Sequence, residues 1–353
     1  MSSGSDAIDA LFSLLAAGRA SDLVLEPRDD GSLDAVARVE GVRRSITTIS
    51  NEHATAAIAR LKALARLPAY ITTEPQDGRI DGRSFGIPGD IRLAVFPTVR
   101  GQRIAMRLPA IGALPDPESL GFEPRVVTHL RRLMREPDGI VLITGPTGSG
   151  KTTTIHSLLR ELASERPDRQ ILTLEDPVER LIPGIAQAEI KAHTGFGFQE
   201  ALRSALRQDA DVLVVGEVRD VETATTAVRA SLSGHLVVAT LHAGRASEVV
   251  PRLLDMGVDR DLLIPALRAI LSQRLLRLAH RGCHGAGCGD CHGGYLGRRV
   301  VTDLALVDHP ARQRLRDGHD LDLTADMDRQ AAELVDSQAT DRGEVLRVLG
   351  RAG

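Results

Sequence analysis

A glycine-rich turn between an apolar run and an amphipathic stretch most constrains what this chain can fold into. The run Ile140–Thr144 leads directly into GPTGSGKT at 145–152, and isoleucine and leucines recur at helical spacing from 155 to 162. A strand, GxxxxGK[ST] and a helix form a phosphate-binding loop, because glycines let backbone N–H groups converge on phosphate oxygens at the positive end of the helix. A chance glycine-rich turn would lack that strand and helix, so we predict that the chain binds a nucleoside triphosphate.

Two side chains of this turn have specific expected roles. Lys151 is a compact, flexible charge suited to the β- and γ-phosphates, which a planar guanidinium would not replace easily. The Thr152 hydroxyl is placed to ligate magnesium. The residues expected to hold the nucleoside triphosphate are Gly145, Pro146, Thr147, Gly148, Ser149, Gly150, Lys151, Thr152 and Thr153.

Polar side chains also follow three further apolar runs. Glu175 ends the run that starts at Ile171, Glu217 follows Val212–Val215, and Thr240 and His242 close the run from Leu236 to Leu241. Carboxyl ends of parallel strands face the crevice where ligands bind. One acid can therefore serve magnesium and the other can orient the attacking water. A single acid could equally cap a following helix, but three such strand ends beside one phosphate loop favour a site.

The order of these segments predicts the fold class. Apolar strands alternating with helical stretches predict an α/β domain whose mainly parallel sheet is covered on both faces. We divide the chain into an amino-terminal α+β domain at 1–108, a proline- and glycine-rich linker at 109–121 and the α/β domain at 122–353. The last part, 302–353, is predicted to be helical. In the first domain we expect strands at 22–26, 45–49 and 91–95 and helices at 7–18 and 53–67; another helix is expected at 123–134.

Composition narrows the class of partner and the compartment. The net charge is −3 and aromatic residues are 2% of the chain. Contacts to nucleic-acid phosphates need a surplus of basic side chains and base stacking needs aromatic ones, so we expect no nucleic-acid partner. No apolar run approaches the roughly 20 residues of a membrane span. The 3 cysteines are too few and odd in number for a disulfide framework, which indicates a reducing, cytoplasmic compartment.

Four ordered segments resemble the type II secretion and type IV pilus assembly ATPases, the GspE/PulE family. They look like its Walker A, Asp box, Walker B and His box: GPTGSGKTTT (145–154), ILTLEDPVER (171–180), LRSALRQDADVLVVGEVRD (202–220) and SGHLVVATLHAG (233–244). Outside this core the resemblance extends through ASDLVLEP (20–27), PQDGRI (75–80), IRLAVFPTVRGQRIAMRL (91–108), LSQRLLRL (271–278) and GYLGRRVV (294–301). The Walker B segment departs from the family in reading DAD at 209–211 where DPD is usual.

The resemblance implies a PAS-like amino-terminal domain followed by a RecA-like ATPase domain in a homo-hexameric ring. ATP hydrolysis would then drive a platform protein of the inner membrane, with the ring at the inner face of the cytoplasmic membrane. It further implies that Lys151 and Thr152 bind ATP and magnesium, Glu175 positions the lytic water, Glu217 serves magnesium and His242 senses the γ-phosphate. Family members often carry a further amino-terminal domain for a cytoplasmic membrane adaptor, and this sequence starts close to ASDLVLEP, so the adaptor stays an open expectation.

Arginines of the amino-terminal domain also gain a role from the resemblance. Arg92 and Arg107 lie where the family supplies arginines to the nucleotide, in the manner of arginine fingers. Solvated arginines of a sheet are the competing interpretation. Arg203 and Arg207, in the Walker B segment, are two further candidates for contact with the nucleotide. Solvated surface arginines are again the competing interpretation.

A compact cysteine cluster suggests structural zinc. Cys288 and Cys291 form a CxxC pair, and Cys283 lies shortly before it. In the family register counted from Gln273, the first family cysteine falls at His280, which gives His280-x-x-Cys283 and Cys288-x-x-Cys291 as a knuckle within 280–292. Three thiolates and one imidazole suit a closed tetrahedral zinc site. Fourth-ligand alternatives are His284 and His292, and a metal-free knuckle with three free thiols is the competing hypothesis.

Three functions are compared. The first is an ATP-hydrolysing hexameric motor that assembles a type II secretion pseudopilus or a type IV pilus-like fibre. The second is a regulatory ring subunit that binds ATP without turnover, which the intact Lys151, Glu175, Glu217 and His242 argue against. The third is a P-loop motor acting on nucleic acid, which the charge balance and low aromatic content disfavour.

Overall fold

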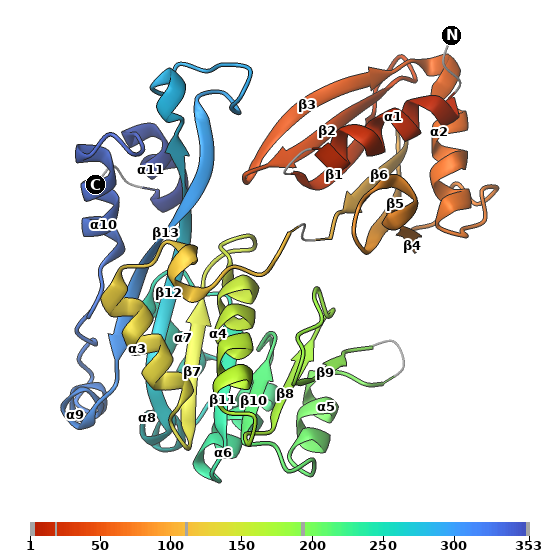
Figure 1. Ribbon diagram of the computed structural model, residues 1–353. Coiled ribbons are helices and arrows are strands. Elements are labelled where there is room, and N and C mark those ends of the chain that lie inside the picture. Colours follow the sequence, from red (N-terminus) through yellow and green to blue (C-terminus); the bar gives the residue numbers. More distant parts are fainter. Residues whose placement is uncertain (1–3, 18–19, 110–111, 192–194, 351–353) are drawn as a thin grey trace. The chain divides into compact units, whose positions relative to one another are not determined.

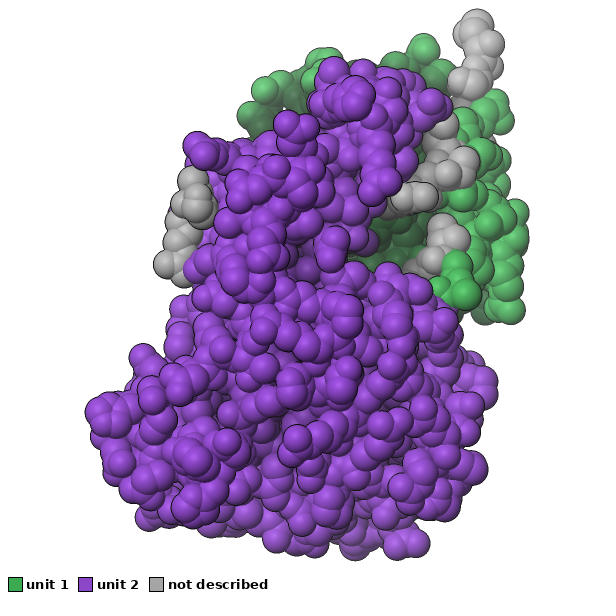
Figure 2. All heavy atoms as spheres, turned by 60° about the vertical axis from the view of Figure 1, so that its left-hand side comes forward, with its two compact units in different colours: residues 1–113 green, residues 114–353 purple. Residues whose placement is uncertain are grey.

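The chain divides into two compact units, each described here by itself. The computed structural model describes residues 4–17, 20–109, 112–191 and 195–350. Unit 1 is Met1–Ala113 and unit 2 is Leu114–Gly353, coloured separately in Figure 2. Within these described ranges, every helix is too short or too polar to cross a bilayer.

Unit 1 is a six-stranded antiparallel sheet with two helices packed on one face (Figure 1). The strand order is β3-β2-β1-β6-β5-β4. Helices α1 (Gly4–Ala17) and α2 (Asn51–Leu64) pack against each other and share one core with the sheet. The strands are β1 (Ala20–Pro27), β2 (Leu33–Val39), β3 (Val42–Ile49), β4 (Gln76–Asp81), β5 (Asp90–Thr98) and β6 (Gly101–Arg107), with a 3-10 turn at Gly82–Phe85.

Alternation along the strands of unit 1 sends apolar and charged side chains to opposite faces. On β1, Leu23 and Leu25 are fully buried in the core that also holds Phe12 of α1 and Leu61 of α2. Intervening residues point the other way, because successive side chains of a strand face opposite sides of the sheet. The uncovered face therefore collects charged residues of the strands, such as Asp22, Arg38, Arg92 and Arg107, beside smaller apolar ones such as Val24 and Ala94.

Unit 2 is built on a seven-stranded, mainly parallel sheet in the order β13-β12-β7-β11-β10-β8-β9. The pairs from β12 to β9 are parallel, and β13 is antiparallel to β12 at one edge. The strands are β7 (Gly139–Thr144), β8 (Ile171–Glu175), β9 (Ala186–Glu189), β10 (Val212–Val215), β11 (Leu236–Leu241), β12 (Leu267–Ala279) and β13 (Tyr295–Leu306).

Helices cover both faces of this sheet, because its central strands are apolar on both sides. Val141 and Ile143 of β7 face a core with α3 (Pro124–Met134) and α4 (Lys151–Glu165), whereas Ile140 and Leu142 face the opposite core. That opposite core includes α5 (Phe198–Ala205), α6 (Val221–Leu232), α7 (Val249–Asp255) and α8 (Arg260–Ala266), with a 3-10 turn at Ala246–Glu248 before α7. The predicted α/β arrangement with two covered faces is confirmed.

The four strands predicted for unit 2 form as β7, β8, β10 and β11, and the expected helix at 123–134 forms as α3. In unit 1 the expected strands lie within β1, β3 and β5, and the helix expected at 53–67 forms as α2 at Asn51–Leu64. The helix expected at 7–18 forms as α1, and Gly18 lies outside the described residues. Three strands of unit 2 were not predicted: β9, β12 and β13.

The predicted helical region 302–353 begins too early. Residues 302–306 belong to β13, where Thr302 and Leu304 are buried and pair with Gln273 and Leu271 of β12. Helices begin only after the strand ends: α9 (His309–Arg316), α10 (Met327–Asp336) and α11 (Arg342–Leu349). The structure of residues 302–306 is therefore determined by antiparallel pairing with a buried neighbouring strand, and not by the helical propensity of the segment.

The segment predicted as a linker, 109–121, includes residues 110–111, which lie outside the described part. Its second half contains a 3-10 turn at Pro117–Leu120. It is attached to α4, because the Ser157 hydroxyl donates to the carbonyl of Pro115 (2.6 Å) and Arg160 donates to that of Leu114 (2.5 Å). The helix that follows the phosphate loop thus anchors the start of unit 2.

Candidate nucleotide and metal sites

The phosphate loop connects β7 to α4 with the geometry that its glycines predict. Gly145, Gly148 and Gly150 all have positive φ, at 145°, 78° and 93°. A Cβ atom on Gly145 would lie 2.6 Å from both the carbonyl oxygen of Gln273 and Oγ of Ser149, so no side chain fits there. The turn leads directly into α4, whose unpaired first N–H groups carry the positive end of the helix dipole. The loop is therefore a cradle for an anion.

Lys151 begins α4, and its side chain lies over this loop. Its Nζ donates to the backbone carbonyls of Gly145 (2.7 Å) and Pro146 (3.2 Å). Burial lowers the pKa of Lys151 below its ordinary value, while the nearby Glu217 carboxylate opposes that shift and the Arg274 charge adds to it. The ammonium thus shares one electrostatic environment with an acid from β10 and an arginine from β12. Thr152 and Thr153 follow it in the first turn of α4.

Glu175 ends β8 as a buried carboxylate with every oxygen engaged. Its side chain is bonded by the Thr173 hydroxyl (2.6 Å) and Gln187 Nε2 (2.9 Å) at Oε1, and by His156 Nε2 (2.9 Å) at Oε2. Burial raises its pKa, but the hydrogen bonds outweigh burial, and the net pKa lies below the ordinary value. Glu175 is therefore an ionised group in a fixed orientation.

Glu217 and His242 come together from the ends of two neighbouring strands. Glu217 follows β10 and His242 follows β11, and His242 Nε2 lies 2.8 Å from Glu217 Oε1. Arg219 approaches the other oxygen at 2.5 Å. Burial raises the pKa of Glu217, but Arg219 and His242 outweigh it, so the pKa is lowered. The Thr240 hydroxyl, also expected at this edge, donates to the carbonyl of Gly216 (2.5 Å).

Strand β12 adds two residues to this edge that had no predicted role. Gln273 is buried, and its Nε2 donates to the carbonyl of Ser149 inside the phosphate loop (2.7 Å). Arg274 is half-buried and donates to the carbonyl of Gly244, just after His242 (2.6 Å). In the sequence they are marked only by the segment LSQRLLRL. Their position beside the phosphate loop results from the pairing of β12 with β7, where Ser272 lies opposite Thr144.

Arg92 and Arg107 lie in unit 1, on neighbouring strands of the uncovered sheet face. They are directly opposite each other in the pairing of β5 with β6. Arg107 Nε is 3.6 Å from a carboxylate oxygen of Asp22. Both arginines line a cavity of about 660 Å³ that also holds Asp77. The other arginines of its lining are Arg38, Arg43, Arg79 and Arg103. This surface has the charge to receive an anion.

Arg203 and Arg207 lie at the end of α5 in unit 2. Arg207 donates to the backbone carbonyl of Arg203 (3.1 Å) and to the hydroxyl of Ser204 (3.4 Å). These are local contacts within one helical turn.

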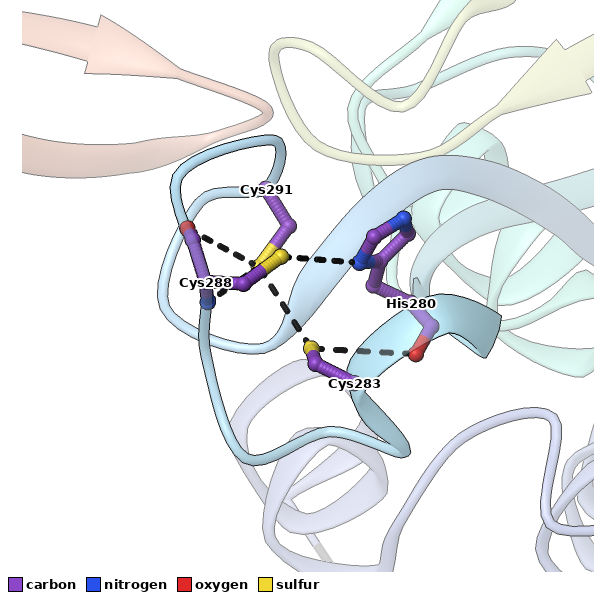
Figure 3. Close-up of side chains that lie close together, drawn as sticks. All are labelled: His280, Cys283, Cys288 and Cys291. Carbon is purple, nitrogen blue, oxygen red and sulfur yellow. Dashed lines mark hydrogen bonds between the residues drawn. The ribbon is translucent and has the colours of Figure 1, made fainter.

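His280, Cys283, Cys288 and Cys291 converge in the connection between β12 and β13 (Figure 3). Their ligand atoms all lie within 4.8 Å of one another. Cys291 Sγ is 3.7 Å from Sγ of both Cys283 and Cys288, and Cys288 Sγ is 3.3 Å from His280 Nδ1. Tetrahedral zinc with Zn–S bonds of about 2.3 Å places its sulfur ligands about 3.8 Å apart. The sulfur spacing therefore fits zinc.

Backbone amides surround the same sulfur atoms. Amides of Cys288 (3.2 Å) and Gly294 (3.3 Å) donate to Cys291 Sγ, and the amide of Gly287 donates to Cys283 Sγ (3.3 Å). Such donors favour thiolates, the form that binds metal. Among the described residues that converge here, His280 is the histidine; the alternatives His284 and His292 are outside the group.

The base of this connection is attached to the carboxyl-terminal helices. The backbone amide of Ala279 donates to the carbonyl of Ala339 (2.8 Å), and Thr340 Oγ1 donates to the carbonyl of Arg277 (2.8 Å). Arg277 lies over the ring of Tyr295, 3.8 Å from its centroid. Unit 2 therefore holds both ends of the loop that carries the cysteines.

Comparison with known proteins identifies the family. The family described as Type II/IV secretion system protein matches residues 5–345 of the chain. The chain belongs to this family. Within it, the type II secretion system protein HxcR of Pseudomonas aeruginosa is 42% identical over 322 residues, 88% of this chain and 68% of HxcR. The type II secretion system ATPase E of Vibrio cholerae is 40% identical over 316 residues, 82% of this chain and 62% of that protein.

A pilus protein belongs to the same set of relatives. The type IV pilus assembly ATPase PilB of Thermus thermophilus is 38% identical over 325 residues, which are 84% of this chain but only 36% of PilB. The chain thus spans between 36% and 68% of the length of these three family members.

Solved structures of similar proteins share the fold. The pilus retraction motor PilT with bound ADP has a TM-score of 0.64 at 26% identity, covering 96% of this chain and 92% of PilT. The ATPase DotB of Legionella pneumophila has a TM-score of 0.70 at 21% identity, covering 95% of this chain and 92% of DotB. Both likenesses agree with the α/β fold expected from the sequence.

Proposed function

We propose that this chain is the ATP-hydrolysing subunit of a hexameric motor that assembles a type II secretion pseudopilus or a type IV pilus-like fibre. One observation carries the proposal: Lys151 of the phosphate loop, the Glu217–His242 pair and Arg274 all meet at the carboxyl edge of one sheet. An anion cradle with a lysine, ionised acids and a further cation is what phosphoryl transfer requires. The secretion and pilus ATPases named above support the type of work.

The nucleotide would be held by unit 2, which we take as a RecA-like domain. The positive-φ glycines and the start of α4 suit its phosphates, and Lys151 suits the β- and γ-phosphates. Thr152 and Glu217 would hold magnesium, whose charge neutralises the phosphates. Glu175 would orient the attacking water, and His242, bonded to Glu217, would respond to the γ-phosphate. These groups bind, orient and exclude water without forming a covalent intermediate.

Unit 1, which we take as a PAS-like domain, would supply arginines to the nucleotide. The cavity of its uncovered sheet face contains Arg92 and Arg107 side by side. Such arginines stabilise the charge of a transferring phosphoryl group. The contact of Arg107 with Asp22 is long, at 3.6 Å, so a stronger anion can compete for this arginine.

The knuckle at 280–292 would hold one structural zinc through His280, Cys283, Cys288 and Cys291. The sulfur spacing and the amide donors support this ligand set. A site with four protein ligands leaves no open position for water, so the zinc would stabilise the loop and take no part in hydrolysis.

The proposed partners are those that the family resemblance implies. We propose that six copies of the chain form the ring, that the ring works against an inner-membrane platform protein, and that it lies at the cytoplasmic face of that membrane. A cytoplasmic membrane adaptor would hold it there. The names of HxcR, ATPase E and PilB support both a secretion and a pilus system.

Nucleic acid is the alternative substrate for a P-loop motor. The net charge of −3 and the aromatic content of 2% disfavour it. Filter binding at low salt distinguishes the two: tight DNA binding that weakens steeply with salt would overturn the secretion motor.

Glu175→Gln tests the motor directly and separates it from a non-hydrolysing subunit. The purified wild-type chain should hydrolyse ATP in the presence of Mg²⁺. Glu175→Gln should still bind ATP, because the phosphate loop is unchanged, while kcat should fall by about 100-fold or more through loss of the charge that orients water. Steady-state phosphate release and equilibrium binding of labelled ATP measure the two effects.

The matched control is Glu165→Gln, at the far end of α4, where the carboxylate pairs with Arg135 at the surface. It should leave kcat unchanged. Near-normal turnover by Glu175→Gln would show that water is positioned elsewhere, and a wild-type chain that binds ATP without turnover would favour the regulatory subunit.

A further inference from the structure

A buried histidine on α4 contacts the carboxylate proposed to orient water. His156 is 4% exposed and Glu175 is 5% exposed. His156 Nε2 lies 2.9 Å from Glu175 Oε2. Histidine at a helix position facing a sheet could simply be a satisfied core residue. Its partner here is an acid at the strand end beside the phosphate loop, so the contact bears on the site itself.

The other carboxylate oxygen is fixed from two directions. The Thr173 hydroxyl and Gln187 Nε2 both donate to Glu175 Oε1. Gln187 is itself locked, because its Nε2 also donates to the carbonyl of Arg180 (3.0 Å) and its Oε1 accepts from the amide of Ile182 (2.7 Å). Oε1 is thus held by β8 and β9, and His156 adds the bond to Oε2 from α4.

Helix α4 links this contact to the phosphate loop. His156 lies four residues after Thr152, so the two side chains lie on the same face of the helix, one turn apart. The loop that would bind phosphate leads into the same helix at Lys151. The helix that carries the proposed magnesium ligand therefore also carries the group that bonds Glu175.

We propose that His156 is a positioning residue that sets the orientation of Glu175 relative to the phosphate loop. The inference rests on the proposed function of Glu175. Without His156, Oε2 would lose this bond in a buried site, which costs free energy, and the carboxylate would be held from β8 and β9 alone. A misplacement of about 1 Å in a catalytic group costs about 100-fold in rate. ATP binding, which depends on the loop backbone and Lys151, would not change.

Two variants at position 156 test this proposal, because both carry a side-chain amide but differ by one methylene in length. In His156→Gln the amide nitrogen can occupy the place of Nε2 and donate to Glu175, whereas in His156→Asn it is one methylene too short. We expect kcat to fall by about 100-fold in His156→Asn and to return to within about fivefold of wild type in His156→Gln. The KM for ATP should stay within about twofold in both variants, since the proposed loss is one of orientation rather than of binding.

A double variant distinguishes action through Glu175 from a separate effect. If His156 acts only through Glu175, His156→Asn combined with Glu175→Gln should be no slower than Glu175→Gln alone. Leu159→Ala, at a fully buried position on the same helix, is the packing control. It should lower the unfolding temperature and leave kcat unchanged at a temperature where the variant is folded.

The outcomes separate the two proposals. Equal kcat values for the Asn and Gln variants, or a double variant slower than Glu175→Gln, would overturn the positioning role while leaving the role of Glu175 intact. A slow His156→Asn beside a fully active Glu175→Gln would overturn both roles and assign His156 an effect of its own. Normal turnover in all variants would overturn both proposals while leaving ATP hydrolysis in place.

Discussion

The two sites of unit 2 are built in opposite ways. The phosphate loop at 145–152 connects a strand whose six residues are all buried to a helix of 15 residues. The proposed metal knuckle at 280–292 is a connection in which Cys291 is the one buried residue of the four that converge. Glycine also recurs through it, at 282, 285, 287 and 289. The phosphate loop is shaped by the fold, whereas the knuckle has little apolar surface to fold around.

This difference predicts how each site depends on what it binds. A loop between buried elements keeps its shape whether or not an anion is present. A knuckle held by few apolar contacts would obtain its folding free energy from the proposed metal, because ligands brought together by zinc replace a hydrophobic core. Variants at the first site should therefore remove function and leave structure, and variants at the second should do the reverse.

Lys151→Ala should have the largest effect on ATP handling. Its ammonium would supply the charge-assisted bonds to the phosphates, and a loss of about 3 kcal/mol is about 100-fold in affinity. We expect the affinity for ATP to fall by about 100-fold or more and hydrolysis to be lost with the phosphate contacts. Labelled-ATP binding and phosphate release measure this, and thermal unfolding should give a midpoint within about 2 °C of wild type, since the loop is held by β7 and α4.

Lys191→Ala, a change of the same kind at an exposed position, should leave both measurements unchanged. Unchanged ATP affinity in Lys151→Ala would overturn the phosphate-loop assignment. A large fall in unfolding temperature would instead show that the loop is not fixed by its flanking elements.

Zinc removal should produce the reverse pattern. Elemental analysis of the wild-type chain should give about one zinc per chain, and Cys288→Ser or a strong chelator should reduce it to a small fraction. We expect residues 280–292 to become sensitive to limited proteolysis, while the affinity for ATP changes by no more than about twofold, because the phosphate loop does not contact the knuckle ligands.

His284→Ala is the matched control, since it removes a histidine of the knuckle that lies outside the converging group. It should keep its zinc, and His280→Ala should lose it. A metal-free wild-type chain that resists proteolysis would refute the zinc site, and loss of zinc in His284→Ala alone would move the fourth ligand.

Sequence patterns were sufficient where burial is continuous. β7, β10 and β11 are apolar at nearly every position, because both faces of each are covered, and such runs are readable from the sequence alone. β12 was missed because Ser272, Gln273, Arg274 and Arg277 interrupt its apolar pattern. Several of these polar groups bond to backbone carbonyls of distant segments, as Gln273 does to Ser149.

The site was predictable by residue type and less so by contact. Glu175 was found from its place at a strand end, but its partners His156 and Gln187 are 19 and 12 residues away with no local signal. The cysteine spacing indicated three metal ligands and the family register added His280, with His284 and His292 as alternatives; the convergence of His280 with the three cysteines is what the structure adds.

Glu344→Gln should have the smallest effect on ATP handling. It tests whether the contacts at the base of the β12–β13 connection stabilise unit 2 independently of the knuckle. Glu344 is buried on α11 and accepts from the backbone amide (2.9 Å), Nε (3.0 Å) and Nη2 (2.7 Å) of Arg277, the residue shortly before the knuckle. Arg347 adds two further bonds. A neutral amide keeps the shape but loses the charge of these bonds, so the free energy of unfolding should fall by about 2 kcal/mol at pH 7.

The pH dependence of that loss checks its cause. Burial raises the pKa of Glu344, but the bonds from Arg347 and Arg277 outweigh it, so the folded-state pKa lies below 4.5. A carboxylate with a lowered pKa stabilises the fold above its unfolded pKa and loses that contribution as pH falls through the folded pKa. The difference between wild type and Glu344→Gln in urea unfolding should therefore be full at pH 7 and shrink progressively below pH 4.5. Zinc content at pH 7 should be the same in both proteins, because α11 contacts the base of β12 and β13 and not the four metal ligands. A Glu344→Gln protein that loses its zinc would show that the knuckle depends on the surrounding fold as much as the phosphate loop does.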